Sequence, residues 1–289
     1  MSTKHCIIIA GPTGIGKTAE AIRIAKELNT EIISADSRQC FLEMNIGVAR
    51  PSPEELEKVR HHFIANHSIT ENITAASFEK EALDHLNTIF KKSTHAIVCG
   101  GTGLYIKALI EGLNEIPPIP QGVREMVIEI HTNQGIKELR KILIEKDPGF
   151  SNSGDINNPN RMMRALEVII HTGNPISFYQ TGEKAKRDFS VSYNVIEMPR
   201  EELYKRIDQR VDAMIKSGLE EEVMSLASYQ ECQALQTVGY KEFFDYFNGI
   251  LSKSEAIDKI KQHTRNYAKR QVTWFKKASL QYPASKFKL

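Results

Sequence analysis

Ile7-Ile8-Ile9-Ala10-Gly11-Pro12-Thr13-Gly14-Ile15-Gly16-Lys17-Thr18 carries the strongest structural signal in this 289-residue chain. A short run of β-branched residues leads into a glycine-rich turn, which leads into a helical pattern of apolar residues. Residues 11–18 fit the pattern G-x-x-x-x-G-K-[ST], in which backbone N–H groups at a helix N-terminus cradle phosphate oxygens. The pattern predicts a phosphate-binding loop, and a glycine-rich turn that binds nothing is the alternative.

The fixed positions of this phosphate loop have chemical roles. Gly14 and Gly16 can adopt backbone angles that other residues avoid, so successive N–H groups can converge on one anion. Lys17 supplies a mobile cation, and the hydroxyl of Thr18 suits the coordination shell of Mg²⁺. The loop therefore predicts a polyphosphate ligand with Mg²⁺ as cofactor, and it leaves the identity of that ligand open.

Composition is that of a soluble globular protein. Apolar residues make up 41% and charged residues 26% of the chain, and no apolar run approaches the roughly 20 residues that span a bilayer. The N-terminus does not resemble a secretory signal. Four scattered cysteines without a C-x-x-C pair fit reduced thiols and no zinc site. We therefore expect a cytoplasmic location and no membrane contact.

Two further apolar runs predict strands that end at polar residues. Residues 32–33 lead to Asp36, and residues 96–99 lead to the turn Gly100-Gly101-Thr102-Gly103. Because ligands of an open parallel sheet lie beyond the carboxyl ends of its strands, we expect Asp36 and Thr102 to face the crevice of the phosphate loop. Asp36 could hold Mg²⁺, act as a general base, or only cap the next helix. The glycines of the turn could let the backbone approach a ligand closely.

A proline-rich segment divides the chain. Three prolines among residues 117–120 cannot continue a helix or a central strand. Beyond them, residues 122–172 have helical periodicity, and strand character returns at residues 192–198. We predict an α/β fold with a P-loop NTPase-like parallel sheet flanked by helices, and an inserted all-helical domain. The predicted core with its C-terminal helices occupies residues 1–116 and 191–289, and the insertion occupies residues 117–190.

The C-terminal part of the chain carries charge of one sign. Residues 259–289 contain nine Lys or Arg and no Asp or Glu, although the net charge of the whole chain is only +2. Along residues 255–278, apolar positions follow one side of a predicted helix, and basic positions that include Arg265 and Lys269 follow another. This pattern is typical of a nucleic-acid partner, and a solvated face balanced by acidic residues elsewhere is the alternative.

Two pairs of arginines lie at helical spacing. Arg161 and Arg164 are three residues apart, and Arg206 and Arg210 are one turn apart. Each pair could hold an anion. For the first pair the alternative is ion pairing within the insertion, because Glu167 follows Arg164 by three residues.

Seven further stretches, in order and with fitting spacing, accompany the phosphate loop. They are DSRQ at 36–39, MNIGVARP at 44–51, GGTGLY at 100–105, NRMMRALE at 160–167, RIDQRV at 206–211, VGY at 238–240 and RQVTWF at 270–275. With these motifs the chain resembles the bacterial tRNA dimethylallyltransferases over nearly its whole length. That P-loop family prenylates N6 of adenosine 37 beside the anticodon.

The resemblance implies a reaction. The phosphate loop would hold the diphosphate of dimethylallyl diphosphate rather than ATP, and the target adenine would be flipped out of its stack. Asp36 would accept the N6 proton and Thr102 would orient the bridging oxygen of the donor. Lys17, the loop N–H groups, Thr18 with Mg²⁺, and one or both of Arg206 and Arg210 would neutralise the departing diphosphate.

The resemblance also implies how RNA is bound. The insertion would help to grip a tRNA anticodon stem-loop, and Gln39 could read the adenine edge. One RNA per chain needs no dimer, so we expect a monomer. The expected tRNA-binding residues are Asp36, Ser37, Arg38, Gln39, Thr102, Asn160, Arg161, Arg164, Gln236, Gly239, Tyr240, Lys241, Arg265 and Lys269.

The chain departs from the family pattern at four positions, to which no role is carried. Phe41, Asn45, Val48 and Arg50 stand where the family commonly has Tyr, Asp, Thr and Lys.

Three other functions stay open: prenylation of free AMP or ATP, phosphorylation of a small molecule by ATP, and non-catalytic RNA binding gated by a nucleotide. The insertion and the basic C-terminal helix argue against the first, because a mononucleotide needs neither.

Overall fold

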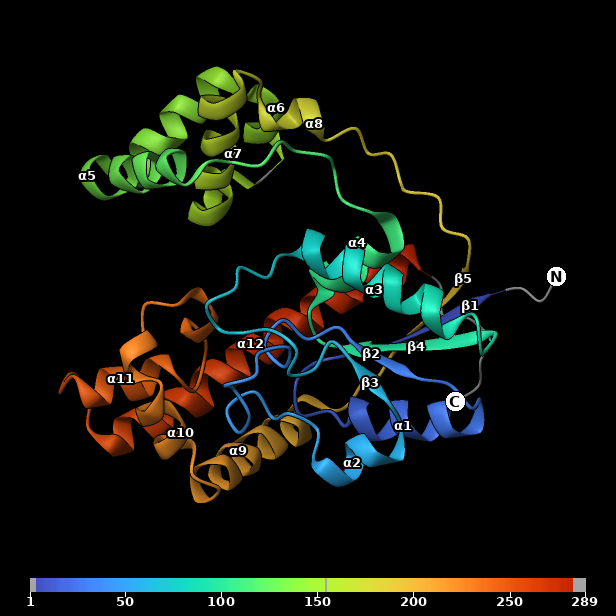
Figure 1. Ribbon diagram of the computed structural model, residues 1–289. Helices are drawn as coiled ribbons and strands as arrows, with labels where there is room; N and C mark the ends of the chain where they lie inside the picture. The colour runs from blue at the N-terminus through green and yellow to red at the C-terminus, as the bar shows by residue number, and fades with distance from the viewer. Residues whose placement is uncertain (1–3, 154, 283–289) are drawn as a thin grey trace. The chain divides into compact units, whose positions relative to one another are not determined.

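The computed structural model describes residues 4–153 and 155–282 and divides the chain into two compact units (Figure 1). One unit combines the chain up to Glu111 with the chain from Lys186 onward, and the other is Gly112–Ala185. The boundaries expected from the proline-rich segment lie a few residues further along the chain at both junctions.

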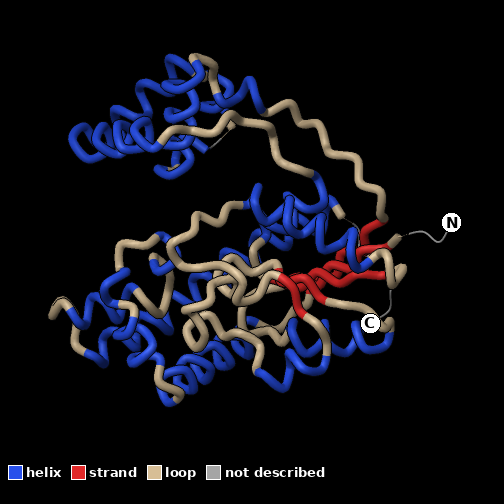
Figure 2. The backbone as a smooth tube through the Cα atoms, in the orientation of Figure 1, coloured by secondary structure: helices blue, strands red, loops and turns tan. Residues whose placement is uncertain are grey.

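The first unit is built on a five-stranded sheet in which every pairing is parallel (Figure 2). The strand order is β3-β2-β4-β1-β5. The strands are β1 (His5–Ala10), β2 (Ile32–Ser34), β3 (His61–His62), β4 (His95–Gly100) and β5 (Ser190–Val195). Because the strands are parallel, the phosphate loop, Asp36 and the glycine turn all follow strand ends at one edge of the sheet. The α/β fold predicted from the sequence is confirmed.

Helices cover both faces of this sheet (Figure 1). Ile7 and Ile9 of β1 pack with the apolar side of α1 (Lys17–Glu27). Ile8, between them, belongs to the core formed with α3 (Ala75–Ile89) and α4 (Gly103–Glu111). Side chains along a strand alternate between its faces, so a strand buried on both sides appears in the sequence as an uninterrupted apolar run.

The C-terminal helices extend this unit beyond the sheet. Gly218, with φ of 95°, separates α9 (Arg200–Lys216) from α10 (Leu219–Ser225). The last helix, α12 (Lys253–Gln281), packs against α9 and α11 (Lys241–Phe247) and reaches α4 and β5. The remaining described helices of this unit are α2 (Pro53–Lys58) and the 3₁₀-helices η2 (Ala227–Tyr229) and η3 (Gln233–Leu235).

The described part of the second unit contains helices and has its own apolar core. Gly135, with φ of 74°, divides α5 (Gln121–Lys146) into two helical segments. The helix α7 (Pro159–Thr172) begins after Asn158, whose side chain accepts the N–H of Arg161, and ends before Gly173, which lies in the left-handed region. The other α-helices described there are α6 (Pro148–Asn152) and α8 (Ile176–Tyr179).

The four cysteines are free thiols: Cys6, Cys40, Cys99 and Cys232. Burial raises the pKa of Cys99 to about 11, although the nearby charge of Lys17 opposes this rise.

Within residues 4–153 and 155–282, none of the helices combines the length and the apolar character that crossing a membrane requires.

One carboxylate holds the loop at residues 45–47. Glu222 of α10 accepts the backbone N–H groups of Asn45 (3.1 Å), Ile46 (2.7 Å) and Gly47 (3.0 Å). It also accepts the hydroxyl of Tyr240 at 2.6 Å. Burial, reinforced by Glu222, raises the pKa of Tyr240, so the hydroxyl remains a donor. A Cβ at Gly47 would lie 2.6 Å from the ring of Tyr240, so this loop packs closely only with glycine there.

We expect Glu222→Gln to lower the free energy of unfolding by about 1–3 kcal/mol, because an amide NH₂ would face donors that a carboxylate now satisfies. Equilibrium urea unfolding measures this change. The neighbouring Glu221→Gln is the matched control, since Glu221 is exposed. Equal stabilities of the two variants would contradict the role assigned to Glu222.

Candidate active site

The phosphate loop has the backbone conformation of an anion site. Gly14 and Gly16 have φ of 83° and 97°, in the left-handed region that the sequence predicted for them. Lys17 Nζ donates to the carbonyl oxygen of Pro12 at 2.8 Å. Burial lowers the pKa of Lys17, while nearby Cys99 and Asp36 act in the opposite direction. The ammonium is thus largely desolvated beside the loop, where its attraction for an anion is stronger than in water.

Asp36 follows β2 and forms a tight turn with its own backbone. Its Oδ1 accepts the N–H groups of Arg38 (2.9 Å) and Gln39 (3.4 Å). These bonds stabilise a turn and not the start of a helix, so the alternative that Asp36 only caps the next helix is wrong. From the part of the chain that the structure describes, no hydrogen bond reaches Oδ2. One oxygen of Asp36 therefore holds the turn, and the other is available to a ligand.

Thr102 joins this turn from the glycine loop that follows β4. Its Oγ1 accepts the N–H of Ser37 at 3.1 Å and donates to the Ser37 hydroxyl at 3.3 Å. Burial, together with the charge of Asp36, raises the pKa of Tyr267 of α12 to about 12. Asp36 and Thr102, which the sequence predicted to share a crevice, are thus connected through Ser37, the residue that follows Asp36.

The two arginines of α9 occupy different environments. Arg210 donates from Nη1 to the Thr13 hydroxyl at 3.2 Å, and burial lowers its pKa while Asp36 opposes that shift. Arg206 is exposed and forms an ion pair with Glu202 at 3.2 Å. Of the two residues predicted to neutralise a diphosphate, the structure therefore brings Arg210, and not Arg206, to the phosphate loop.

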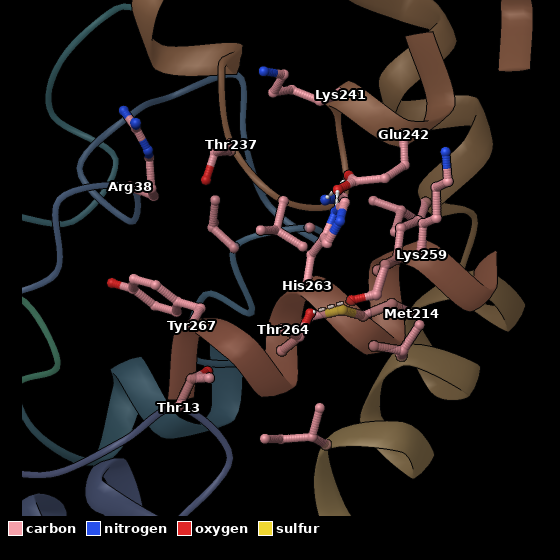
Figure 3. A pocket seen from close by; sticks show the side chains of 18 of the residues that line it. Thr13, Arg38, Met214, Thr237, Lys241, Glu242, Lys259, His263, Thr264 and Tyr267 are labelled. Carbon is pink, nitrogen blue, oxygen red and sulfur yellow. Dashed lines mark hydrogen bonds and ion pairs between the residues drawn. The ribbon is translucent and has the colours of Figure 1, made fainter. Parts of the chain in front are cut away.

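A cavity of about 540 Å³ adjoins these groups (Figure 3). In Figure 3, Thr13 of the phosphate loop and Lys241 of α11 lie at opposite sides of the view, with Tyr267 near Thr13. Asp36, Arg38 and Arg210 are among its charged lining residues. Its apolar lining residues are Val48, Ile207, Val211, Met214, Leu219, Val238 and Ile260. The cavity therefore offers a charged part and an apolar part to one ligand.

Two residues predicted to contact RNA are engaged within the protein. Gln39 donates from Nε2 to the carbonyl oxygens of Val48 (3.3 Å) and Ala49 (2.9 Å), so reading an adenine edge would require these bonds to be exchanged. Tyr240 is fully buried and gives its hydroxyl to Glu222. The prediction that the Tyr240 side chain contacts RNA is therefore corrected: this residue supports the loop at 45–47.

The segment before α11 contributes to the cavity lining. Gln236 and Lys241 line it and are exposed. The N–H of Gly239 donates to Glu242 Oε2 at 2.7 Å, and the other oxygen of Glu242 contacts His263 Nδ1 at 2.5 Å (Figure 3). Gln236 and Lys241 are thus accessible to a ligand, and their contact with RNA stays a prediction.

The arginines predicted to contact RNA phosphates have acidic partners here. Arg164 pairs with Glu167 at 3.0 Å, Arg161 pairs with Asp155, and Arg265 pairs with Asp208 at 2.5 Å. Within the insertion this is the ion-pair alternative that the spacing had left open. Asn160 and Lys269 are exposed. Lys286 and Lys288 of the basic C-terminal stretch lie outside the described residues.

The four departures from the family pattern fill structural positions. Phe41 is buried in the main core, and Val48 is buried and accepts from Gln39 through its carbonyl oxygen. Arg50 donates from Nη2 to the carbonyl oxygens of Phe41 (2.7 Å), Leu42 (3.0 Å) and Met44. Asn45, whose backbone is held by Glu222, is exposed.

The glycines of the turn after β4 make room for protein atoms. A Cβ at Gly100 would lie 2.2 Å from the Ala35 carbonyl oxygen, and one at Gly101 would lie 2.3 Å from Gln271 Nε2. A Cβ at Gly103 would lie 2.0 Å from Trp274 Nε1. The expectation that these glycines let a ligand approach is corrected, because in this structure the space beside them is filled by Ala35, which follows β2, and by side chains of α12.

Tyr267 and Gln271 of α12 belong to the site, although the sequence predicted no role for either residue. Tyr267 lines the cavity, and Gln271 contacts both loops of the site. A signal was available, because a phenol or an amide within an apolar stripe needs a hydrogen-bond partner once it is buried.

A parallel sheet with an anion-binding loop at its carboxyl edge defines a P-loop protein, and comparisons with known proteins specify which kind. The family model described as IPP transferase matches residues 39–278. The tRNA dimethylallyltransferase of Cytophaga hutchinsonii is 44% identical over 274 residues, covering 95% of this chain and 90% of that relative. The chain belongs to the IPP transferase family.

Solved structures agree with this assignment. The tRNA isopentenylpyrophosphate transferase of Bacillus halodurans matches with a TM-score of 0.68 at 35% identity, covering 94% of this chain and 87% of that one. A eukaryotic dimethylallyltransferase acting on tRNA matches with a TM-score of 0.80 at 28% identity, covering 94% and 70%. The similarity therefore extends over nearly all of this chain.

Proposed function

We propose that this protein transfers the dimethylallyl group of dimethylallyl diphosphate to N6 of adenosine 37 in tRNA and releases diphosphate. The observation that carries the proposal is the meeting of the phosphate loop, Asp36, Thr102 and Arg210 beside one cavity that is charged in part and apolar in part. The name of the Cytophaga relative, tRNA dimethylallyltransferase, supports tRNA as the acceptor and dimethylallyl as the group transferred.

The diphosphate would occupy the phosphate loop. Backbone N–H groups at the start of α1 and the ammonium of Lys17 suit its charge. Arg210 reaches the loop through Thr13 and would meet the departing oxygens. These fixed charges stabilise the leaving group as it forms, which is where electrostatic catalysis contributes most.

The hydrocarbon of the donor would follow the apolar lining of α9. Ile207, Arg210, Val211 and Met214 lie at helical spacing, and all four line the cavity. One helix face thus presents a cation beside three apolar side chains, which matches a diphosphate joined to a five-carbon chain. A hydroxyl-bearing substrate of a small-molecule kinase would have no use for this apolar wall.

The exocyclic amine of adenine is a weak nucleophile because its lone pair is delocalised into the ring. In the proposed step the N6–C1 bond forms, the C1–O bond of the donor breaks, and diphosphate carries away the electron pair. The N6 proton becomes acidic as the new bond forms, and Asp36 Oδ2 would accept it. Thr102, fixed by Ser37, would orient the bridging oxygen.

We propose Mg²⁺ as the cofactor. Thr18 lies half-buried in the first turn of α1, and no described residue hydrogen-bonds to its hydroxyl. This hydroxyl fits the preference of Mg²⁺ for oxygen ligands, with water and diphosphate oxygens completing the shell. When bound, the ion would neutralise negative charge on the diphosphate. Within the described residues, no group of three or more His, Cys, Asp or Glu is placed to hold a metal ion.

We also propose that the insertion and the basic side of α12 bind the anticodon stem-loop, and that a single chain suffices.

Lys269→Gln should weaken stem-loop binding and reduce the slope of log affinity against log salt by about one, because one phosphate contact is lost. Fluorescence anisotropy across a salt series measures both. Lys26→Gln on α1, also exposed, is the control. A slope unchanged from that of the control would remove Lys269 from the RNA interface.

A label-transfer assay tests the proposed function. The protein, Mg²⁺ and radiolabelled dimethylallyl diphosphate are mixed with an anticodon stem-loop that carries adenosine 37. AMP and a guanosine-37 stem-loop replace it in parallel reactions. We expect label in the adenosine stem-loop alone. Label in AMP would favour the mononucleotide enzyme, and ATP turnover without label in RNA would favour a kinase.

A further inference from the structure

One buried amide on α12 connects the two loops of the site. Gln271 is 6% exposed. Its Oε1 accepts the N–H of Thr13 in the phosphate loop at 2.9 Å, and its Nε2 donates to the carbonyl oxygen of Gly101 at 2.9 Å. The acceptor end of the amide thus holds one loop while the donor end holds the other.

This bridge lies where three segments converge. A Cβ at Gly101 would be 2.3 Å from Gln271 Nε2 and 3.4 Å from the carbonyl oxygen of Gly11. One turn of α12 further along, Trp274 seats in the same way over Gly103. The start of the phosphate loop, the glycine turn and α12 are therefore in close contact, and small displacements of one must move the others.

The residues on either side of the bridge take part in the proposed reaction. Thr13, whose N–H is held by Gln271, accepts a hydrogen bond from Arg210 through its hydroxyl. Gly101 immediately precedes Thr102, whose hydroxyl is fixed to Ser37. In the proposed reaction, Thr13 and Arg210 lie at the leaving diphosphate, and Thr102 orients its bridging oxygen. Gln271 connects the two loops and therefore fixes the distance between these groups.

We propose that Gln271 is a positioning residue that fixes the phosphate loop against the loop of Thr102. It touches neither substrate and acts through the register of the two loops. Only a side chain with both an acceptor and a donor can make this bridge, which separates Gln271 from an ordinary core residue. The proposal rests on the proposed prenyl transfer, because that reaction assigns roles to the bridged loops.

The variant Gln271→Met tests the bridge because it keeps the length of the side chain and removes both hydrogen bonds. We expect its single-turnover rate with saturating donor and stem-loop to fall by about 10²-fold, the size of effect that a small misplacement of reacting groups produces. Stem-loop affinity should not change. Gln262→Met is the matched control, since Gln262 is an exposed glutamine on the same helix.

The variant Gln271→Glu keeps the acceptor for Thr13 and removes the donor for Gly101. It guards against a loss of folding in Gln271→Met, which leaves two buried polar groups unpaired. We expect Gln271→Glu also to slow the single turnover, measured at a temperature where urea unfolding shows that each variant is folded. A rate equal to that of Gln262→Met in both folded variants would overturn the proposal.

A double-mutant cycle separates positioning from a structural role. If Gln271 acts through Thr102, then Gln271→Met should cost clearly less in the Thr102→Ala background than in the wild type. Additive rate losses would overturn the proposal. A wild type that transfers no prenyl group would count against the proposed function, whereas an active wild type with additive losses would count against the positioning role alone.

Discussion

Lys17→Met is expected to lower the single-turnover rate of prenyl transfer by at least about 10²–10³-fold, the loss that accompanies removal of one fixed donor to a developing negative charge. Burial lowers the pKa of Lys17, so this ammonium has given up much of its hydration. The Lys17 ammonium therefore attracts an anion in the phosphate loop strongly, and a water molecule in its place would not supply an equal attraction.

This effect should arise in the chemistry and not in the stability of the fold. Lys17 makes a hydrogen bond to Pro12, but desolvation of its charge opposes folding, so removing it should leave the urea midpoint nearly unchanged. Lys26→Met serves as the control because Lys26 is an exposed lysine of the same helix. A Lys17→Met rate close to that of Lys26→Met would show that the loop does not bind the leaving diphosphate in the manner proposed.

Asp36→Asn is expected to reduce the single-turnover rate by about 10²–10⁴-fold, the contribution of a positioned general base. This substitution separates the two roles of Asp36, because the side-chain oxygen of asparagine can still accept the N–H groups of Arg38 and Gln39. The turn is therefore retained while the basic oxygen is lost.

The matched control for this substitution is Asp84→Asn, on the exposed side of α3. Single-turnover rates and stem-loop affinities are compared for both variants. We expect Asp36→Asn to bind RNA and donor but to transfer the prenyl group slowly. Near-normal transfer by Asp36→Asn would assign the proton to another acceptor and leave Asp36 with its turn-forming role alone.

The parts of the fold that could be predicted from the sequence are those with strong local signals. The apolar run of β1 and the glycine pattern after it specified a strand, a loop and a helix at once. The proline-rich residues 117–120 likewise indicated a boundary close to the start of the second unit. Each of these is a local property of a few consecutive residues.

Other features could not be predicted because they depend on residues far apart in the chain. The edge strand β3 is only His61-His62, too short and too polar to form a pattern. The burial of Tyr240 follows from Glu222 and Gly47, which approach it only after folding. Similarly, the spacing of Arg206 and Arg210 did not reveal which of them turns toward the phosphate loop.

The positions of the catalytic candidates illustrate the same division. Asp36 and Thr102 could be expected at one edge because the topology of a parallel sheet requires it. Gln271 and Tyr267 could not be, since the helical pattern records only that they lie on the inward side of α12. The hydrogen-bond partners of Gln271, in loops more than 150 residues away along the chain, come close only in the folded protein.

The strongest single test of prenyl transfer is the mass of the RNA fragment that contains position 37 after reaction. An anticodon stem-loop with adenosine 37 is incubated with the protein, Mg²⁺ and dimethylallyl diphosphate, cleaved into short oligonucleotides, and analysed by tandem mass spectrometry. We expect adenosine 37 to gain one C₅H₈ unit on its base and the other adenosines to remain unchanged. An unmodified adenosine 37, alongside full modification by an active family member under the same conditions, would show that the protein does not catalyse the proposed transfer.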